Sequence, residues 1–313
     1  MKSKDQVLFN NPREKLERFS TNVRPLPGLA AAARQDSLIR QFIESIHRVK
    51  FPALIGSRNI SARRADPSDH LFDPLRAAII HQRAGNTDEA FWLIFLFVHF
   101  GKHATGGWRY AREVYGRLGD SPHWTWANTS ADPAAFRRWL HERQARLKRP
   151  GVPGGFGNHR KYESLDAYKV KGTGNAVETY VTWIDPPRTH EELFVSQCAL
   201  AGGDPRKAFA TLYKSMSQVA RFGRTARFDY LAMIGKLGLA NIEPDSTYMS
   251  GSTGPAAGAK LLFFNDSAQN IASKILDLWL VELDGGLGVG MQVIEDALCN
   301  WQKSPNVFKP FRG

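Results

Sequence analysis

The sequence predicts an all-α fold, built mainly of helices, on three observations. Apolar residues recur at helical spacing in one segment after another, starting with residues 36–49. Helix start and stop signals repeat along the chain, with Asp or Ser before a segment, Pro in its first turn and Gly after its end. Only residues 180–184 (YVTWI) alternate apolar and polar side chains in the way that predicts a β-strand.

The first helices have clear start and stop signals. In residues 36–49, Asp36 or Ser37 is the expected N-cap of a helix with one apolar face. A second helix is expected to open at Asp73, with Pro74 in its first turn and Gly85 after its end. Both segments therefore combine an apolar face with a defined beginning.

The longest apolar run, residues 90–100 (AFWLIFLFVHF), predicts a buried helix. Glu89 and Lys102 bound this run, so it is too short to cross a bilayer. Two further helices are expected over residues 108–118 and, after an Asp-Pro start, over residues 132–149.

Gly and Pro are dense in residues 150–175, which predicts a long loop at a boundary between two helical lobes. Helical spacing returns after this loop and continues to about residue 303. The expected organisation is a basic N-terminal extension (1–65), an N-terminal helical lobe (66–150) and a C-terminal catalytic lobe (151–313). We expect the three parts to act as one functional unit.

Composition and charge limit the class of protein. Of 313 residues, 42 are Lys or Arg and 30 are Asp or Glu, a formal net charge of +12. Hydrophobic residues make up 42%, which excludes wholesale disorder. Two cysteines are too few for a disulfide framework, and the N-terminal residues do not resemble a signal peptide, so a cytoplasmic protein without membrane segments is expected. The positive charge predicts an anionic partner, most often nucleic acid.

The Gly-rich loop holds the first candidate site. Residues 154–165 (GGFGNHRKYESL) combine cations, hydrogen-bond donors and aromatic rings on a backbone that can approach a ligand closely. Phosphate binding needs this combination, although a solvated basic loop is the alternative. Upstream, residues 137–149 carry many arginines against the single acid Glu142, which indicates either a track for a nucleic-acid backbone or a solvated helix face.

A second candidate site lies in residues 220–239 (ARFGRTARFDYLAMIGKLGL). A turn at Gly223 followed by a cationic helix is a general device for binding a DNA backbone. Asp229 lies in an apolar stretch, so it is either a salt-bridged structural acid or an active-site acid. Further along, Asp245 is either an N-cap or a catalytic acid, and Glu295 is a candidate for proton transfer on the face that also carries Cys299.

Four segments carry a resemblance to a known family: residues 154–165 and 220–239, described above, and residues 72–103 and 248–264 (YMSGSTGPAAGAKLLFF). The chain resembles the α-glutamyl/putrescinyl thymine pyrophosphorylase family, clade 3, over about residues 70–303. The resemblance implies a fold similar to that of helix–hairpin–helix DNA glycosylases. It also implies a transferase of thymine hypermodification in a bacterial or phage-infected cell. In that reaction an amine or amino acid replaces the pyrophosphate of a pyrophosphorylated 5-hydroxymethyluracil in double-stranded DNA.

The implied chemistry assigns roles to the candidate residues. The candidate catalytic acids and bases are Asp229, Glu295 and Asp245. The candidate pyrophosphate ligands are His159, Arg160, Lys161, Arg224 and Arg227. The candidate contacts to DNA and to a flipped base are Phe156, Asn158, Tyr162, Gly223, Thr225, Lys236 and Tyr248. No metal ligands are assigned, although a divalent metal ion that assists pyrophosphate departure stays open.

Two other classes of function compete with the transferase. A DNA glycosylase would cut the glycosidic bond of a modified or damaged base and leave an abasic site. A non-catalytic DNA-binding protein would bind the backbone with a steep salt dependence and leave the bases unchanged.

Overall fold

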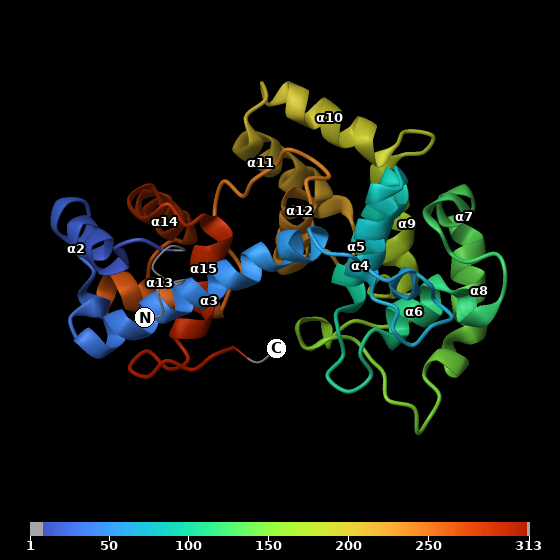
Figure 1. Cartoon of the computed structure of the whole chain (residues 1–313), viewed down its shortest axis with the longest axis horizontal. Coiled ribbons are helices and arrows are strands. Elements are labelled where there is room, and N and C mark those ends of the chain that lie inside the picture. The colour runs from blue at the N-terminus through green and yellow to red at the C-terminus, as the bar shows by residue number, and fades with distance from the viewer. Residues whose placement is uncertain (1–8, 312–313) are drawn as a thin grey trace. The chain divides into compact units, whose positions relative to one another are not determined.

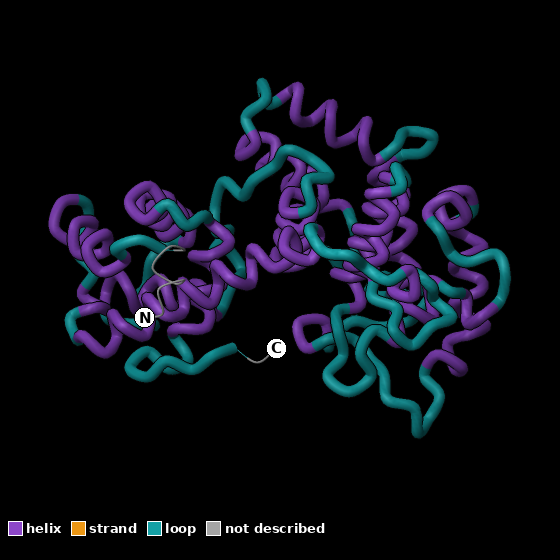
Figure 2. The backbone as a smooth tube through the Cα atoms, in the orientation of Figure 1, coloured by secondary structure: helices purple, strands orange, loops and turns teal. Residues whose placement is uncertain are grey.

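The computed structural model describes residues 9–311, which form two compact units. Unit 1 combines the two ends of the chain, up to Phe51 and from Pro244 onward, and unit 2 spans Pro52–Glu243. In the described residues all regular structure is helical, with fourteen α-helices (Figures 1 and 2). The predicted all-α class is therefore confirmed.

Unit 1 packs helices from both ends of the sequence around one apolar core. Its core includes Phe42, Leu262, Leu283 and Trp301, all of which are fully buried. Burying side chains of this size stabilises a fold by roughly 1.5–3 kcal/mol each. The helices of this unit are α2 (Pro12–Asn22), most of α3 (Ala32–Gly56), α13 (Gly254–Phe264), α14 (Ser273–Leu287) and α15 (Met291–Trp301).

Unit 2 is built around one buried helix, α5 (Thr87–Phe100). Helix α5 contacts α4, α6, α7, α10 and α12, which explains why its apolar residues are not confined to one face. The other helices of unit 2 are α4 (Pro74–Arg83), α6 (Arg109–Tyr115), α7 (Trp126–Ala131), α8 (Pro133–Leu147), α9 (Thr173–Ile184), α10 (His190–Leu200), α11 (Pro205–Ser215) and α12 (Arg224–Lys236).

Helix caps agree with the sequence at two of the predicted starts. Asp73 caps α4 by accepting a hydrogen bond from the Arg76 N–H at 3.1 Å. The prediction of Asp36 or Ser37 as an N-cap is wrong, because α3 begins at Ala32. The second confirmed cap is Asp132 at the start of α8.

The predicted strand at residues 180–184 is wrong, because these residues end helix α9. A window of five residues is too short to separate the two periods. Over the whole helix, the buried residues Val177, Tyr180, Val181 and Ile184 follow the helical period. No helix within residues 9–311 is long and apolar enough to span a bilayer.

Candidate active site

A glycine brings the loop between α8 and α9 against the end of α5. The backbone N–H of Gly157 donates to the carbonyl oxygen of Phe100 at 2.7 Å. A Cβ on Gly157 would lie 2.9 Å from backbone atoms of Gly101 and Lys102, so only glycine fits. This contact fixes the start of the single 3₁₀ turn Asn158–Arg160, which carries part of the predicted phosphate site.

Arg160 ties the same loop to two other segments of unit 2. Its side chain is only 10% exposed and donates to the carbonyl oxygens of His99 at 3.3 Å and Arg221 at 3.0 Å. Burial lowers the pKa of Arg160, while the nearby carboxylates of Glu163 and Asp229 raise it. The predicted phosphate ligand therefore uses two of its five N–H donors on backbone carbonyls, and its charge acts on Asp229.

The segment that enters α12 is fixed to the same loop and to α5. Arg221 donates to both carboxylate oxygens of Glu163, at 2.6 and 3.1 Å. The ring of Phe222 stacks on Phe95 at a centroid distance of 4.9 Å and on His99 at 6.4 Å. The loop and the start of α12 are thus held together within one unit.

Helix α12 presents the second group of predicted ligands. Its N-cap Gly223 has extended backbone angles, and a Cβ there would meet no atom within 4 Å, so the turn does not require glycine. Arg224 is partly exposed and Thr225 is exposed at the first turn. Arg227 donates to the Tyr213 carbonyl at 3.0 Å and lies 4.3 Å from the centre of its ring, so this cation is engaged within the unit.

Asp229 is the carboxyl on which the two segments act together. The Asp229 side chain is accessible to solvent, but the protein around it reduces the hydration of the carboxyl. This desolvation raises the pKa of Asp229. Four basic side chains oppose that effect and lower the pKa: Lys236, His159, Arg160 and Arg224. The structure therefore brings predicted residues of the loop and of α12 to one carboxyl.

The predicted stacking residues of the loop differ in how they are placed. Phe156 packs against Phe100, with stacked rings 5.5 Å apart, and against the edge of Tyr110. Tyr162 is 82% exposed, and the Lys161 ammonium lies 5.1 Å from the centre of its ring. Tyr162 therefore has the more accessible ring of the two.

The remaining predicted site residues belong to unit 1. Asp245 lies in the segment before α13, where no helix begins, so the N-cap alternative is wrong. Its Oδ1 instead accepts a hydrogen bond from the Tyr248 hydroxyl at 2.6 Å. Glu295 is partly buried in α15. The catalytic roles of Asp245 and Glu295 and the base-stacking role of Tyr248 stay predictions.

A buried chain of hydrogen bonds, which the sequence did not reveal, crosses unit 2. The Tyr230 hydroxyl lies 2.8 Å from that of Tyr180, and Tyr180 lies 2.7 Å from Nε2 of His190. Nδ1 of His190 lies 2.5 Å from the carboxylate of Asp88 in the first turn of α5. None of these four residues is a candidate in the sequence, because they come from four different helices and meet only in the fold.

The direction of these hydrogen bonds follows from the charges. Burial lowers the pKa of His190, which favours the neutral ring. Nδ1 must donate to the Asp88 carboxylate, so Nε2 accepts from Tyr180, and Tyr180 in turn accepts from Tyr230. The chain is fully satisfied and fixes Tyr230, the neighbour of Asp229 in α12.

Comparison with protein families identifies the chain. The family model for α-glutamyl/putrescinyl thymine pyrophosphorylase clade 3 matches residues 33–313. The chain belongs to this family. The resemblance found in the sequence is thereby confirmed. Comparisons with curated proteins and with solved structures gave no match.

Membership of the α-glutamyl/putrescinyl thymine pyrophosphorylase family indicates an enzyme of thymine hypermodification, with DNA that carries a modified thymine as its substrate. Such a substrate suits a basic chain of net charge +12. Across residues 9–311, no group of three His, Cys, Asp or Glu side chains is arranged to hold a metal ion.

Proposed function

We propose that this protein replaces the pyrophosphate of 5-pyrophosphoryloxymethyluracil in DNA with an amine or an amino acid. The observation that carries the proposal is the position of Asp229, a solvent-accessible carboxyl under the influence of four basic side chains from the loop and α12. A reaction in which an amine displaces pyrophosphate needs a base to accept the proton of the amine. It also needs positive charge to stabilise the leaving pyrophosphate.

The proposed reaction is a substitution at the 5-methylene carbon. The amine nitrogen forms a bond to this carbon, and the bond from carbon to the pyrophosphate oxygen breaks, so pyrophosphate leaves with the electron pair. The Asp229 carboxylate accepts the proton that the nitrogen loses. Lys236, His159 and Arg224 offset the negative charge that grows on the leaving pyrophosphate.

The target base must leave the duplex to reach these side chains. Enzymes that act on a base in DNA turn the nucleotide out of the stack and hold the base against aromatic or apolar side chains. The exposed ring of Tyr162 supports such a role. Asn158 and His159, exposed in the same turn, supply hydrogen-bond donors for the base or the pyrophosphate.

Nucleoside mass spectrometry tests the proposal. Purified protein is incubated with duplex DNA containing 5-pyrophosphoryloxymethyluracil and a panel of amino acids and polyamines. We expect a new substituted thymidine and an equal amount of released pyrophosphate. Asp229→Asn is expected to lose turnover and to retain DNA binding, whereas Asp120→Asn, at an exposed acid, is expected to keep both.

The other outcomes favour the competing functions. Abasic sites in place of a substituted thymidine would identify a glycosylase. Binding to the DNA without a new nucleoside or released pyrophosphate, for every amine of the panel, would identify a non-catalytic DNA-binding protein. Either result overturns the transferase.

A further inference from the structure

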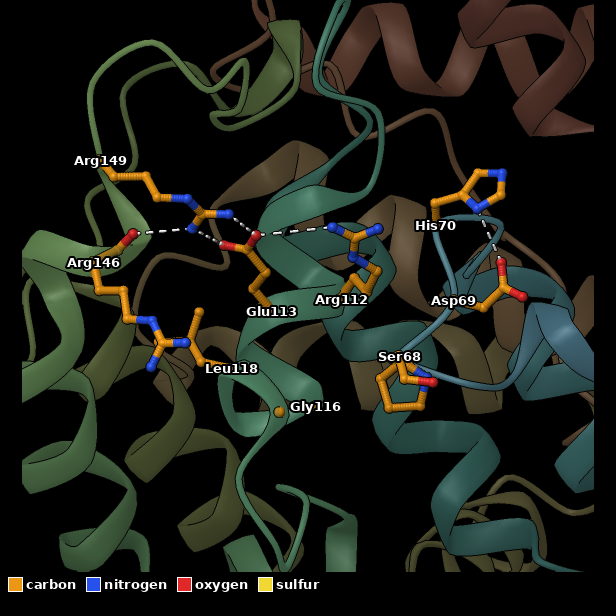
Figure 3. Close-up of a pocket in the computed structure, with 11 residues that line it drawn as sticks. Ser68, Asp69, His70, Arg112, Glu113, Gly116, Leu118, Arg146 and Arg149 are labelled. Carbon is orange, nitrogen blue, oxygen red and sulfur yellow. Dashed lines mark hydrogen bonds and ion pairs between the residues drawn. The ribbon is translucent and has the colours of Figure 1, made fainter.

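A second cationic site lies in unit 2, in a pocket with a volume of about 730 Å³ (Figure 3). A single ordered water needs only about 10–15 Å³ of such space, so the pocket can hold a polyatomic ligand. The loop before α4, helix α6 with the turn that follows it, and the end of α8 form its walls. We call it the Glu113 pocket, after the carboxylate in it. Its lining includes Asp69, His70, Arg112, Glu113, Arg146 and Arg149.

One buried carboxylate serves three guanidinium groups in this pocket. Arg149 donates to both oxygens of Glu113, at 3.0 and 2.7 Å, and Arg109 donates to one of them at 3.1 Å. Arg112 lies 3.8 Å away, and Figure 3 shows it facing Glu113 from the side opposite Arg149. A single negative charge therefore leaves these three cations far from neutralised.

Two further features add to the excess of positive charge. Among the described residues the exposed guanidinium of Arg146 forms no ion pair, and it lines the pocket beside Arg149 (Figure 3). Asp69, the other acid of the lining, is already paired with Arg63 at 2.5 Å. Four guanidinium groups thus surround one available carboxylate.

Arg109, the most buried of these cations, also has an N–H donor without an acceptor in the described residues. Nε of Arg109 is buried and finds no hydrogen-bond acceptor within residues 9–311, although the side chain is only 7% exposed. Arg109 lies directly under the Gly-rich loop, since a Cβ on Gly154 would fall 2.1 Å from its Nε. The same cation therefore joins the Glu113 pocket to the loop that carries His159 and Tyr162.

We propose that the Glu113 pocket binds a phosphate group through Arg146, Arg149 and Arg112. Guanidinium groups bind phosphate oxygens in pairs of parallel hydrogen bonds, and Glu113 holds two of these groups in place before the ligand arrives. The phosphate belongs either to the DNA backbone or to free pyrophosphate. The proposal does not depend on the transfer reaction, because neither ligand has to react.

Binding measurements on matched variants test this site. Affinity for inorganic pyrophosphate is measured by calorimetry, and affinity for a short unmodified duplex by fluorescence anisotropy at several salt concentrations. The variants are Arg146→Gln, which removes only an exposed side chain, and the double variant Arg146→Gln/Arg149→Gln. Lys148→Gln is the control, because Lys148 is an exposed cation of the same segment outside the pocket.

We expect Arg146→Gln to lower the affinity for one of the two ligands by roughly tenfold, because charge-assisted hydrogen bonds are lost. The double variant is expected to lower this affinity further. A loss in duplex binding, with a shallower salt dependence, identifies a backbone phosphate. A loss confined to pyrophosphate identifies the free anion. The proposal is overturned if neither ligand is weakened, or if Lys148→Gln weakens both as much as Arg146→Gln does. Unchanged thermal unfolding of Arg146→Gln establishes that the pocket itself was tested.

Discussion

Arg221 donates two hydrogen bonds to Glu163, from Nε to Oε2 at 2.6 Å and from Nη2 to Oε1 at 3.1 Å. This pair joins the Gly-rich loop to the residues that enter α12, the two segments whose cations act on Asp229. The Glu163 carboxylate is only 7% exposed and also lies 3.5 Å from Arg160. Glu163 therefore fixes the relative position of the two parts of the proposed site.

Glu163→Gln is expected to lower the free energy of unfolding by about 3 kcal/mol, because it leaves two guanidinium groups without a buried counterion. Turnover is expected to fall with it, since the loop and α12 lose their connection. Urea denaturation and nucleoside mass spectrometry measure the two effects. Glu243→Gln removes an exposed ion pair with Arg206 and is expected to cost at most ~1 kcal/mol. Equal losses in the two variants would contradict this assignment.

The sequence was informative where structure is local. Helix caps such as Asp73 and Asp132 depend on a few consecutive residues, and both were predicted correctly. The apolar run of α5 was correctly expected to be buried, because its length and composition decide the outcome. The strand expected at residues 180–184 was wrong because five residues do not define a period.

The parts that sequence could not supply depend on contacts between distant segments. Arg160 lies in a loop rich in cations, and nothing local indicates that its donors go to His99 and Arg221. The Glu113 pocket depends on Arg149, which lies after the end of α8 and meets a carboxylate of α6. Only the pair Arg109 and Glu113, four residues apart in one helix, had a local signal.

The pH dependence of turnover should report the cations around Asp229. The base must be ionised, so kcat/KM is expected to rise with pH through an apparent pKa above the ordinary value of an aspartate, since burial raises the pKa of Asp229. Lys236 opposes this effect, so Lys236→Gln is expected to move the acidic limb to higher pH. Lys236→Arg keeps the charge and should leave the limb in place. A limb that stays fixed in Lys236→Gln would remove Asp229 as the base.

Gly157→Ala should detach the Gly-rich loop from α5. Its Cβ would lie 2.9 Å from the backbone, which cannot yield as a flexible side chain does, and we expect a cost of about 1–3 kcal/mol in unfolding free energy. Faster proteolysis within residues 150–165 is the expected second sign. Gly285→Ala is the control: this glycine lies inside α14 in open space, so alanine should stabilise unit 1 by up to about 1 kcal/mol. A neutral Gly157→Ala would show that the loop does not depend on this contact.

Stability should decrease as pH falls below the ordinary pKa of histidine, near 6.5. Burial lowers the pKa of both His99 and His190, so at mildly acidic pH the unfolded chain binds protons that the folded chain does not. The stabilisation is complete above the unfolded pKa and is lost as pH falls towards the folded values. His99 cannot easily adapt, because its Nε2 donates to Thr173, and its Nδ1 is buried without a partner in the described residues.

The midpoints of urea denaturation at pH 7.5 and 5.5 measure this effect. The variant His190→Asn isolates the contribution of His190 to the pH dependence of stability. We expect the variant to be less stable at pH 7.5, since Tyr180 and Asp88 lose a partner, but to lose less stability on acidification than the natural protein. Comparing the two proteins cancels the contributions of carboxyl groups that do not contact His190, among them Glu89, whose pKa burial raises and whose effect has the opposite sign. The same drop in midpoint for both proteins would mean that His190 is not the titrating group.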